Sequence, residues 1–114
     1  MGDLSAHFSK REFACRCCGV WAADPFLIRV LENIRARSGK PLRIVSGFRC
    51  VEHNKSVGGA PGSQHVTGKA ADIDPGRATL AQARAAGAAG IGTRGKWAVH
   101  VDVRATPSTW SYGP

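Results

Sequence analysis

The sequence lacks any long apolar run. None of its 114 residues belongs to a stretch of the roughly 18 or more apolar residues that a membrane-spanning helix requires. The N-terminal segment MGDLSAHFSKREF also lacks the apolar core of a secretory signal peptide. We therefore expect no membrane span, and we expect that export, where it occurs, depends on another factor or on a leader outside this sequence. At 12.0 kDa, the chain is expected to form a single domain over residues 1–114.

Acidic residues are scarce. The chain has 8 Asp and Glu against 16 Lys and Arg, which gives a net charge of +8. A surface of this charge attracts polyanions such as nucleic acids, anionic envelope polymers and lipid headgroups. The basic residues are spread along the chain rather than gathered in a tail, and no base-reading motif accompanies them. We therefore expect no specific recognition of nucleic acid.

Cysteines are few, and three of the four lie in one short run, CRCC. They are Cys15, Cys17, Cys18 and Cys50. This run differs from the paired CxxC arrangement of a zinc ribbon. Three states remain open: reduced structural thiols, a disulfide that ties the N-terminal segment to Cys50, and a second metal site with Cys50 as the distant ligand.

Start and stop signals predict three helices. Ser9 and Glu12 fit a capping box at the start of a short helix. Asp24 followed by Pro25 predicts the start of a longer amphipathic helix that ends at Gly39. The alanine-rich segment 79–89, with Thr79 as its cap, predicts a third helix that leads to the next strand.

Three β-rich segments predict strands, at residues 42–46, 69–74 and 97–104. The glycine-rich segment 57–63 predicts a loop that brings His65 into position. Three further glycines, Gly90, Gly92 and Gly95, predict turns. A tail with two aromatic residues, Trp110 and Tyr112, follows Pro107. The expected fold is α+β, with a small, mainly antiparallel sheet flanked by helices.

Candidate metal ligands are concentrated in residues 44–72, where His65 and Asp72 supply an imidazole nitrogen and a carboxylate oxygen. Both are good ligands for Zn²⁺, which takes three protein ligands in a catalytic site and leaves one position to water. His100 is the expected third ligand. The alternation of apolar residues around it predicts a half-buried strand with His100 and Asp102 on one face. Arg49 follows the strand at 42–46, where its planar fork would hold a substrate oxygen; on spacing alone, the alternative is an ordinary surface arginine.

Four ordered motifs resemble the M15 family of zinc peptidases: Ser46-Gly47-Phe48-Arg49, His53-Asn54, Ser63-x-His65-x-x-Gly68-x-Ala70-x-Asp72, and Val99-His100-Val101-Asp102. That family includes D-alanyl-D-alanine carboxypeptidases and peptidoglycan endopeptidases. The resemblance implies a zinc fold like that of these peptidases and of hedgehog domains. It also implies that His65, Asp72 and His100 bind Zn²⁺, and that Arg49 steadies a substrate carbonyl or carboxylate. The metal would activate a water molecule for hydrolysis.

The sequence departs from the family pattern next to the last zinc ligand. Several relatives carry an acidic general base three residues before the final histidine, where this chain has Trp97, and others carry a histidine at the position of Ala98. Asp102 is therefore a candidate base, because it shares a strand face with His100. The alternative role for Asp102 is to orient a histidine or to pair with Arg104.

These features predict a zinc metallopeptidase that hydrolyses peptide bonds in peptidoglycan stem peptides, either as a D-Ala-D-Ala carboxypeptidase or as an endopeptidase. We expect a monomer that acts on the cell envelope, either in a periplasm or after release by a phage, with peptidoglycan peptides as its partners. Two other classes of function compete with this prediction. One is a non-catalytic, zinc-stabilised cell-wall-binding module, and the other is a basic nucleic-acid-binding domain whose cysteines form a zinc knuckle.

Overall fold

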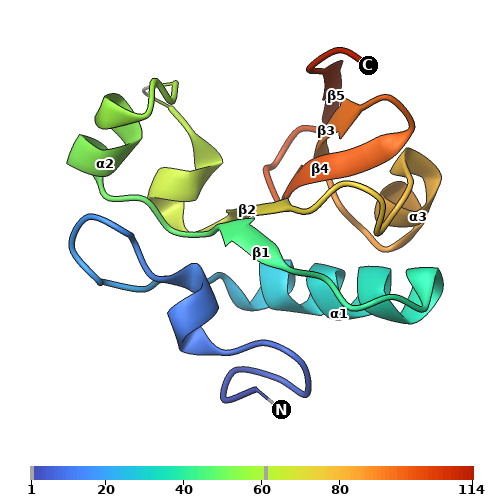
Figure 1. Ribbon diagram of the computed structural model, residues 1–114, viewed down its shortest axis with the longest axis horizontal. Helices are drawn as coiled ribbons and strands as arrows, with labels where there is room; N and C mark the ends of the chain where they lie inside the picture. Colours follow the sequence, from blue (N-terminus) through green and yellow to red (C-terminus); the bar gives the residue numbers. More distant parts are fainter. Residues whose placement is uncertain (1, 61) are drawn as a thin grey trace.

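The computed structural model describes residues 2–60 and 62–114 (Figure 1). Its elements, in chain order, are η1 (Lys10–Phe13), α1 (Pro25–Ser38), β1 (Ile44–Ser46), α2 (Val51–Ser56), η2 (Gln64–Thr67), β2 (Ala70–Ile73), α3 (Leu80–Ala85), β3 (Gly90–Arg94), β4 (Trp97–Asp102) and β5 (Ser108–Ser111), where η marks a 3₁₀ helix. The predicted α+β class is confirmed.

The long helix α1 forms as its sequence predicts. The Asp24 side chain accepts a hydrogen bond from the Phe26 amide at 2.8 Å, which caps the first turn. Gly39 ends the helix in the left-handed conformation, with φ of 68°. The apolar face of the helix is buried, and Leu27, Leu31 and Ile34 are fully inaccessible to solvent.

The N-terminal capping box also forms, although the helix that it begins is a single 3₁₀ turn. Glu12 accepts a hydrogen bond from the Ser9 amide at 2.7 Å. Phe8 and Phe13 on either side of the turn are fully buried and pack edge to face, with ring centroids 6.3 Å apart. These two rings fix the N-terminal segment to the domain.

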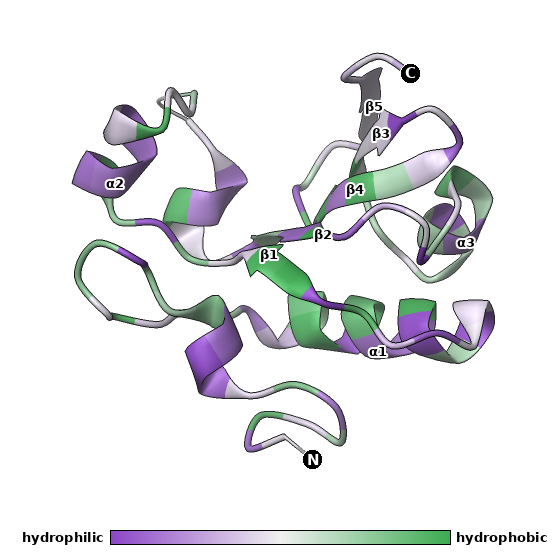
Figure 2. Ribbon diagram, in the orientation of Figure 1, coloured by the Kyte–Doolittle hydropathy of each residue, from purple (hydrophilic) through white to green (hydrophobic). Residues whose placement is uncertain are grey.

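The five strands form one sheet in the order β1-β2-β4-β3-β5. Every neighbouring pair is antiparallel except β3 and β5, which are parallel. Ala71 on β2 lies opposite Val101 on β4, and Val101 lies opposite Ile91 on β3. All three belong to the buried apolar cluster that contains the core side chains of α1. In Figure 2 the hydrophobic stretches of α1, β1 and β4 are accordingly drawn in green.

Two predictions for the C-terminal half are wrong in detail. Gly90 and Gly92 lie within strand β3 rather than in turns. The tail, for which no element is predicted, forms strand β5. Helix α3 ends at Ala85, because Gly87 adopts a φ of 106° that a continuing helix does not allow. Helix α2 had no signal that the sequence analysis used.

The two β3 glycines are explained by close approach. A Cβ atom on Gly90 would overlap the carboxylate of Asp102, and a Cβ atom on Gly92 would lie 2.7 Å from the indole nitrogen of Trp110. Glycine inside a strand often marks such a contact. Both partners lie at or beside the candidate site described below.

None of the helices formed by residues 2–60 and 62–114 combines the length and the apolar character needed to cross a membrane.

The Gly90 contact gives a stability prediction. Gly90→Ala should lower the free energy of unfolding by about 1–3 kcal/mol, because the added methyl group forces the buried Asp102 carboxylate to move. Gly62→Ala is the matched control, since a Cβ atom there meets nothing within 4 Å. Urea denaturation followed by circular dichroism measures both variants. Equal stability of the two would show that Asp102 has room to shift.

Candidate metal centre

One row of residues crosses the whole sheet and carries the candidate site. Ser46 pairs with Asp72, Asp72 with His100, His100 with Gly92, and Gly92 with Trp110. Side chains in one such row lie on the same face of a sheet. The antiparallel pairing of β2 with β4 therefore brings Asp72 and His100 directly beside each other.

His65 reaches this row from the 3₁₀ turn η2. The Ser63 hydroxyl accepts a hydrogen bond from the His65 amide at 3.2 Å, and Gly68 ends the turn with a φ of 73°. The imidazole is 3% exposed, and its Nδ1 lies 2.8 Å from the carbonyl oxygen of Gly47. A carbonyl oxygen only accepts, so Nδ1 carries the proton and Nε2 faces Asp72 with its lone pair free for a metal.

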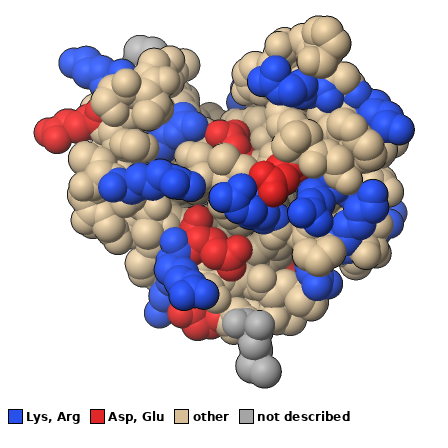
Figure 3. All heavy atoms as spheres, viewed as in Figure 1, with Lys and Arg blue, Asp and Glu red and all other residues tan. Residues whose placement is uncertain are grey.

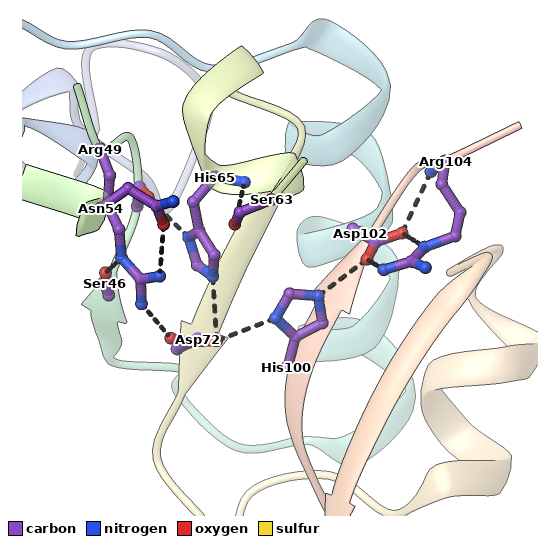
Figure 4. A network of polar contacts seen from close by, with 10 residues as sticks. Ser46, Arg49, Asn54, Ser63, His65, Asp72, His100, Asp102 and Arg104 are labelled. Carbon is purple, nitrogen blue, oxygen red and sulfur yellow. Dashed lines mark hydrogen bonds and ion pairs between the residues drawn. The ribbon is translucent and has the colours of Figure 1, made fainter. Parts of the chain in front are cut away.

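His100 is oriented in the same way by a carboxylate. Its Nε2 lies 2.7 Å from Asp102 Oδ2, and its Nδ1 lies 3.0 Å from Asp72 Oδ1 (Figure 4). With the Nε2 proton donated to Asp102, Nδ1 becomes the ligand atom. A histidine whose second nitrogen donates to a carboxylate is the usual arrangement at protein metal sites.

The three predicted ligand residues therefore converge. The ligand atoms of His65, Asp72 and His100 all lie within 4.8 Å of one another, and Asp72 Oδ1 is 3.2 Å from His65 Nε2. Two imidazole nitrogens and one carboxylate oxygen match the donor set of three-ligand catalytic zinc sites. Both imidazoles have their other nitrogen already engaged, so the residues fit a bound Zn²⁺ in donor type and in tautomer.

The electrostatics of the metal-free site favour a proton where the metal would bind. Burial opposes ionisation of Asp72, but its polar contacts with the imidazoles of His100 and His65 outweigh it and hold the pKa of Asp72 well below its usual range. Burial alone would lower the pKa of His100, whereas its hydrogen bonds to Asp102 and Asp72 raise it above its ordinary value. A cation at this position therefore replaces a proton on His100.

The contacts of Asp102 are those that the second of its two predicted roles requires. Its side chain is fully buried, and it accepts hydrogen bonds from His100 Nε2 and from Arg104 Nε (2.8 Å) and Nη2 (2.6 Å). Burial raises the pKa of Asp102, but these bonds outweigh it and hold the pKa well below its usual range. A carboxylate held in its ionised form by hydrogen bonds from two residues is a poor proton acceptor. The geometry therefore favours Asp102 as the residue that orients His100, rather than as the general base.

Arg49 lies on the other side of Asp72, as Figure 4 shows. Its three guanidinium nitrogens contact Ser46 Oγ (3.2 Å), Asn54 Oδ1 (3.3 Å) and Asp72 Oδ2 (3.1 Å). Each terminal nitrogen of an arginine carries two protons, so one N–H on each remains for another acceptor. Asn54 is itself buried and donates to the Ala60 carbonyl at 2.8 Å. From the sequence alone, Asn54 belongs to a motif but has no predicted role.

The site opens into a cleft of about 480 Å³. Its lining includes the three ligand residues, Arg49 and Arg104, the glycine-rich segment 58–62 in its described residues, and Trp110 and Tyr112. The Trp110 ring packs against His100, with centroids 5.0 Å apart, and Arg104 stacks on Trp110 at 4.8 Å. Figure 3 shows a notch between the part of the surface over α2 and the part over β3 to β5, with basic side chains around it. Sequence reasoning missed Trp110, because the parallel pairing of β5 that positions it has no local signal.

A buried pair of histidines with one aspartate, set in a cleft and flanked by arginines, is the kind of site that hydrolytic metalloenzymes use. A comparison with family models agrees with the geometry. The model described as Peptidase M15 matches residues 6–102, and the chain belongs to this family of metallopeptidases. No curated protein matches the chain.

The proton on His100 gives a pH prediction for metal binding. Since Zn²⁺ needs the Nδ1 lone pair, its apparent affinity should rise with pH until the raised pKa of His100 is passed, by about tenfold per pH unit below it. A competition titration against a chromophoric chelator between about pH 6 and pH 8 measures this, and calorimetry in two buffers counts the released proton. An affinity for Zn²⁺ that does not change with pH would contradict the prediction that the metal replaces a proton on His100.

The orienting role of Asp102 predicts a loss of metal affinity. Asp102→Asn keeps the shape but removes the charge that fixes His100, and Zn²⁺ affinity should fall by about 10- to 100-fold. The same chelator competition measures it, with the exposed carboxylate variant Asp3→Asn as the control. Unchanged affinity with turnover lost at saturating zinc would instead identify Asp102 as the base.

Proposed function

We propose that the chain is a zinc peptidase that hydrolyses peptide bonds in peptidoglycan stem peptides. The observation that carries the proposal is the convergence of His65 Nε2, His100 Nδ1 and Asp72 Oδ1 at the floor of a cleft, in a chain of the M15 peptidase family. A Zn²⁺ bound there would polarise the scissile carbonyl and lower the pKa of a water molecule. The proposed place of action is the cell envelope.

The protein residues around the metal position have separate tasks. Gly47 and Asp102 hold the two imidazoles in the tautomers that present a lone pair to the cleft. Arg49 is held by Ser46 and Asn54 and keeps N–H groups for a substrate carbonyl or carboxylate, where it would stabilise developing negative charge. Trp110 covers one side of His100 and limits access of water to that side.

The shape of the surface suits an extended peptide. A second hollow, of about 470 Å³, shares Arg49, Asp72 and Tyr112 with the first, so open space lies on both sides of these residues. A substrate chain would be able to pass across the site with residues on either side of the scissile bond. This supports an endopeptidase more than a carboxypeptidase, whose cleft is closed around a free carboxylate.

Digestion of purified peptidoglycan tests this proposal. The zinc-loaded protein should release cleaved stem peptides, which mass spectrometry identifies, and free D-alanine would indicate a carboxypeptidase instead. His65→Ala should lose more than about a hundredfold in rate, since a ligand matters more than the residues that orient it. His7→Ala is the matched control, because His7 is exposed and contacts Glu32 rather than the site. A chelator should abolish activity, and added zinc should restore it.

One observation favours a second candidate function, a zinc-stabilised module that binds cell wall without cutting it. Among the described residues that line the cleft, Asp72 is the only carboxylate. Trp97, at the position of the acidic base in several relatives, is instead covered by Lys40 and Lys96, whose amino groups lie 5.6 and 4.8 Å from its ring centroid. Zinc-dependent sedimentation with peptidoglycan, without any product, would support the module and contradict the peptidase.

A further inference from the structure

The four cysteines lie together on one side of the molecule, and none of them belongs to the candidate metal centre described above. The sulfur atoms of Cys15, Cys18 and Cys50 all lie within 4.8 Å of one another, and Cys17 directly precedes Cys18 in the chain. Cys15 is buried, Cys50 is half-buried, and the other two are exposed. Segments about thirty residues apart in the chain therefore present their thiols to one point.

The spacing of these sulfurs is that of metal ligands. Cys15 Sγ and Cys50 Sγ are 3.7 Å apart, and all four cysteines are free thiols. A disulfide brings two sulfurs to about 2.05 Å. Two sulfurs bound tetrahedrally to one zinc at about 2.3 Å lie about 3.8 Å apart. The observed separation is longer than a disulfide and fits two thiolates on one zinc, and it is also the distance of a direct thiol–thiol hydrogen bond.

The backbone around the first cysteines forms a tight turn. Cys15 and Cys18 have C-x-x-C spacing, and the Gly19 amide donates to the Cys15 carbonyl at 2.8 Å, with a φ of 76° at Gly19. The Cys15 amide donates to the Val20 carbonyl at 2.7 Å. The CRCC run differs from the paired CxxC arrangement of a zinc ribbon, but Cys15 and Cys18 form one C-x-x-C pair within it. The sulfur of Cys50 lies beside this pair.

Backbone amides also donate to the sulfurs. The Cys50 amide lies 3.5 Å from Cys15 Sγ, and the His53 amide lies 3.4 Å from Cys50 Sγ. Hydrogen bonds to sulfur favour the thiolate, which is the form that binds metal.

We propose that Cys15, Cys18 and Cys50, with Cys17 as the fourth thiolate, bind a second Zn²⁺ that has a structural role. Four thiolates fill the coordination sphere of Zn²⁺ and leave no position for water, so this site is structural rather than catalytic. Each thiol gives up its proton on binding. The ion joins the N-terminal segment to the segment that follows β1, next to Arg49.

Metal content and cobalt spectroscopy test the site separately from peptidase activity. Protein purified with a reductant should contain two zinc ions per chain, and His65→Ala should retain one. In the His65→Ala protein, Co²⁺ should give an intense sulfur-to-cobalt charge-transfer band. Adding Cys18→Ser should remove the band, and adding Cys17→Ser should weaken it. If the unmodified protein contains only one zinc, and His65→Ala retains both that zinc and the band, the result would support this site and count against the first centre.

Two results would overturn the proposal. One is a His65→Ala protein that binds neither zinc nor cobalt while all four thiols react with a thiol reagent. The other is an intact mass lower by two protons, with a Cys15–Cys50 linked peptide after digestion and no sulfur-bound metal. Both measurements use chains with all four cysteines, so they decide the question even where a serine variant fails to fold. Circular dichroism verifies the fold of each variant.

Discussion

The pairing register of β2 with β4 is the constraint on which the site depends. Asp72 faces His100 only because Ala71 faces Val101 on the opposite side of the same two strands. A slip of one residue would move every side chain to the other face of the sheet. Such a slip of β2 would place Asp72 toward the buried apolar cluster and remove Ala71 from it, while Val101 on β4 would lose its partner in the core. The same pairing register therefore determines both the packing of the core and the assembly of the candidate metal centre.

A row of charged side chains in mutual contact crosses the sheet at this register. Each carboxylate in the row lies between two positive or proton-bearing groups. The contacts run in the order Arg49, Asp72, His100, Asp102 and Arg104. Burial of a carboxylate such as Asp102 is costly unless it is paired and hydrogen-bonded. Arg104 and His100 meet that requirement, and the absence of a side chain at Gly90 leaves the space for it. The orientation of His100 therefore depends on strands β3 and β4 together.

How much the sequence predicts depends on whether a signal is local. Capping and periodicity identify α1, and alternation places His100 and Asp102 on one face, because both signals lie within one element. The ligand set follows from residue chemistry and family motifs. Strand β5, and with it the contact of Trp110 with His100, arises from parallel pairing with a strand distant in the chain. The two glycines of β3 suggest turns until their partners across the sheet are known.

Arg49 shows how the two proposed metal sites would depend on each other. Its guanidinium is held by residues from β1, α2 and β2, while its backbone amide donates to the His65 carbonyl at 3.1 Å. The next residue is Cys50, and the preceding Phe48 amide donates to the Phe13 carbonyl at 3.1 Å. A segment of three residues thus contacts the N-terminal segment, the cysteine cluster and the histidine turn. Only three residues form β1, so sheet pairing alone holds this segment weakly. A metal bound by the cysteines would add a further attachment next to Arg49, whose cationic group needs a fixed position in the site.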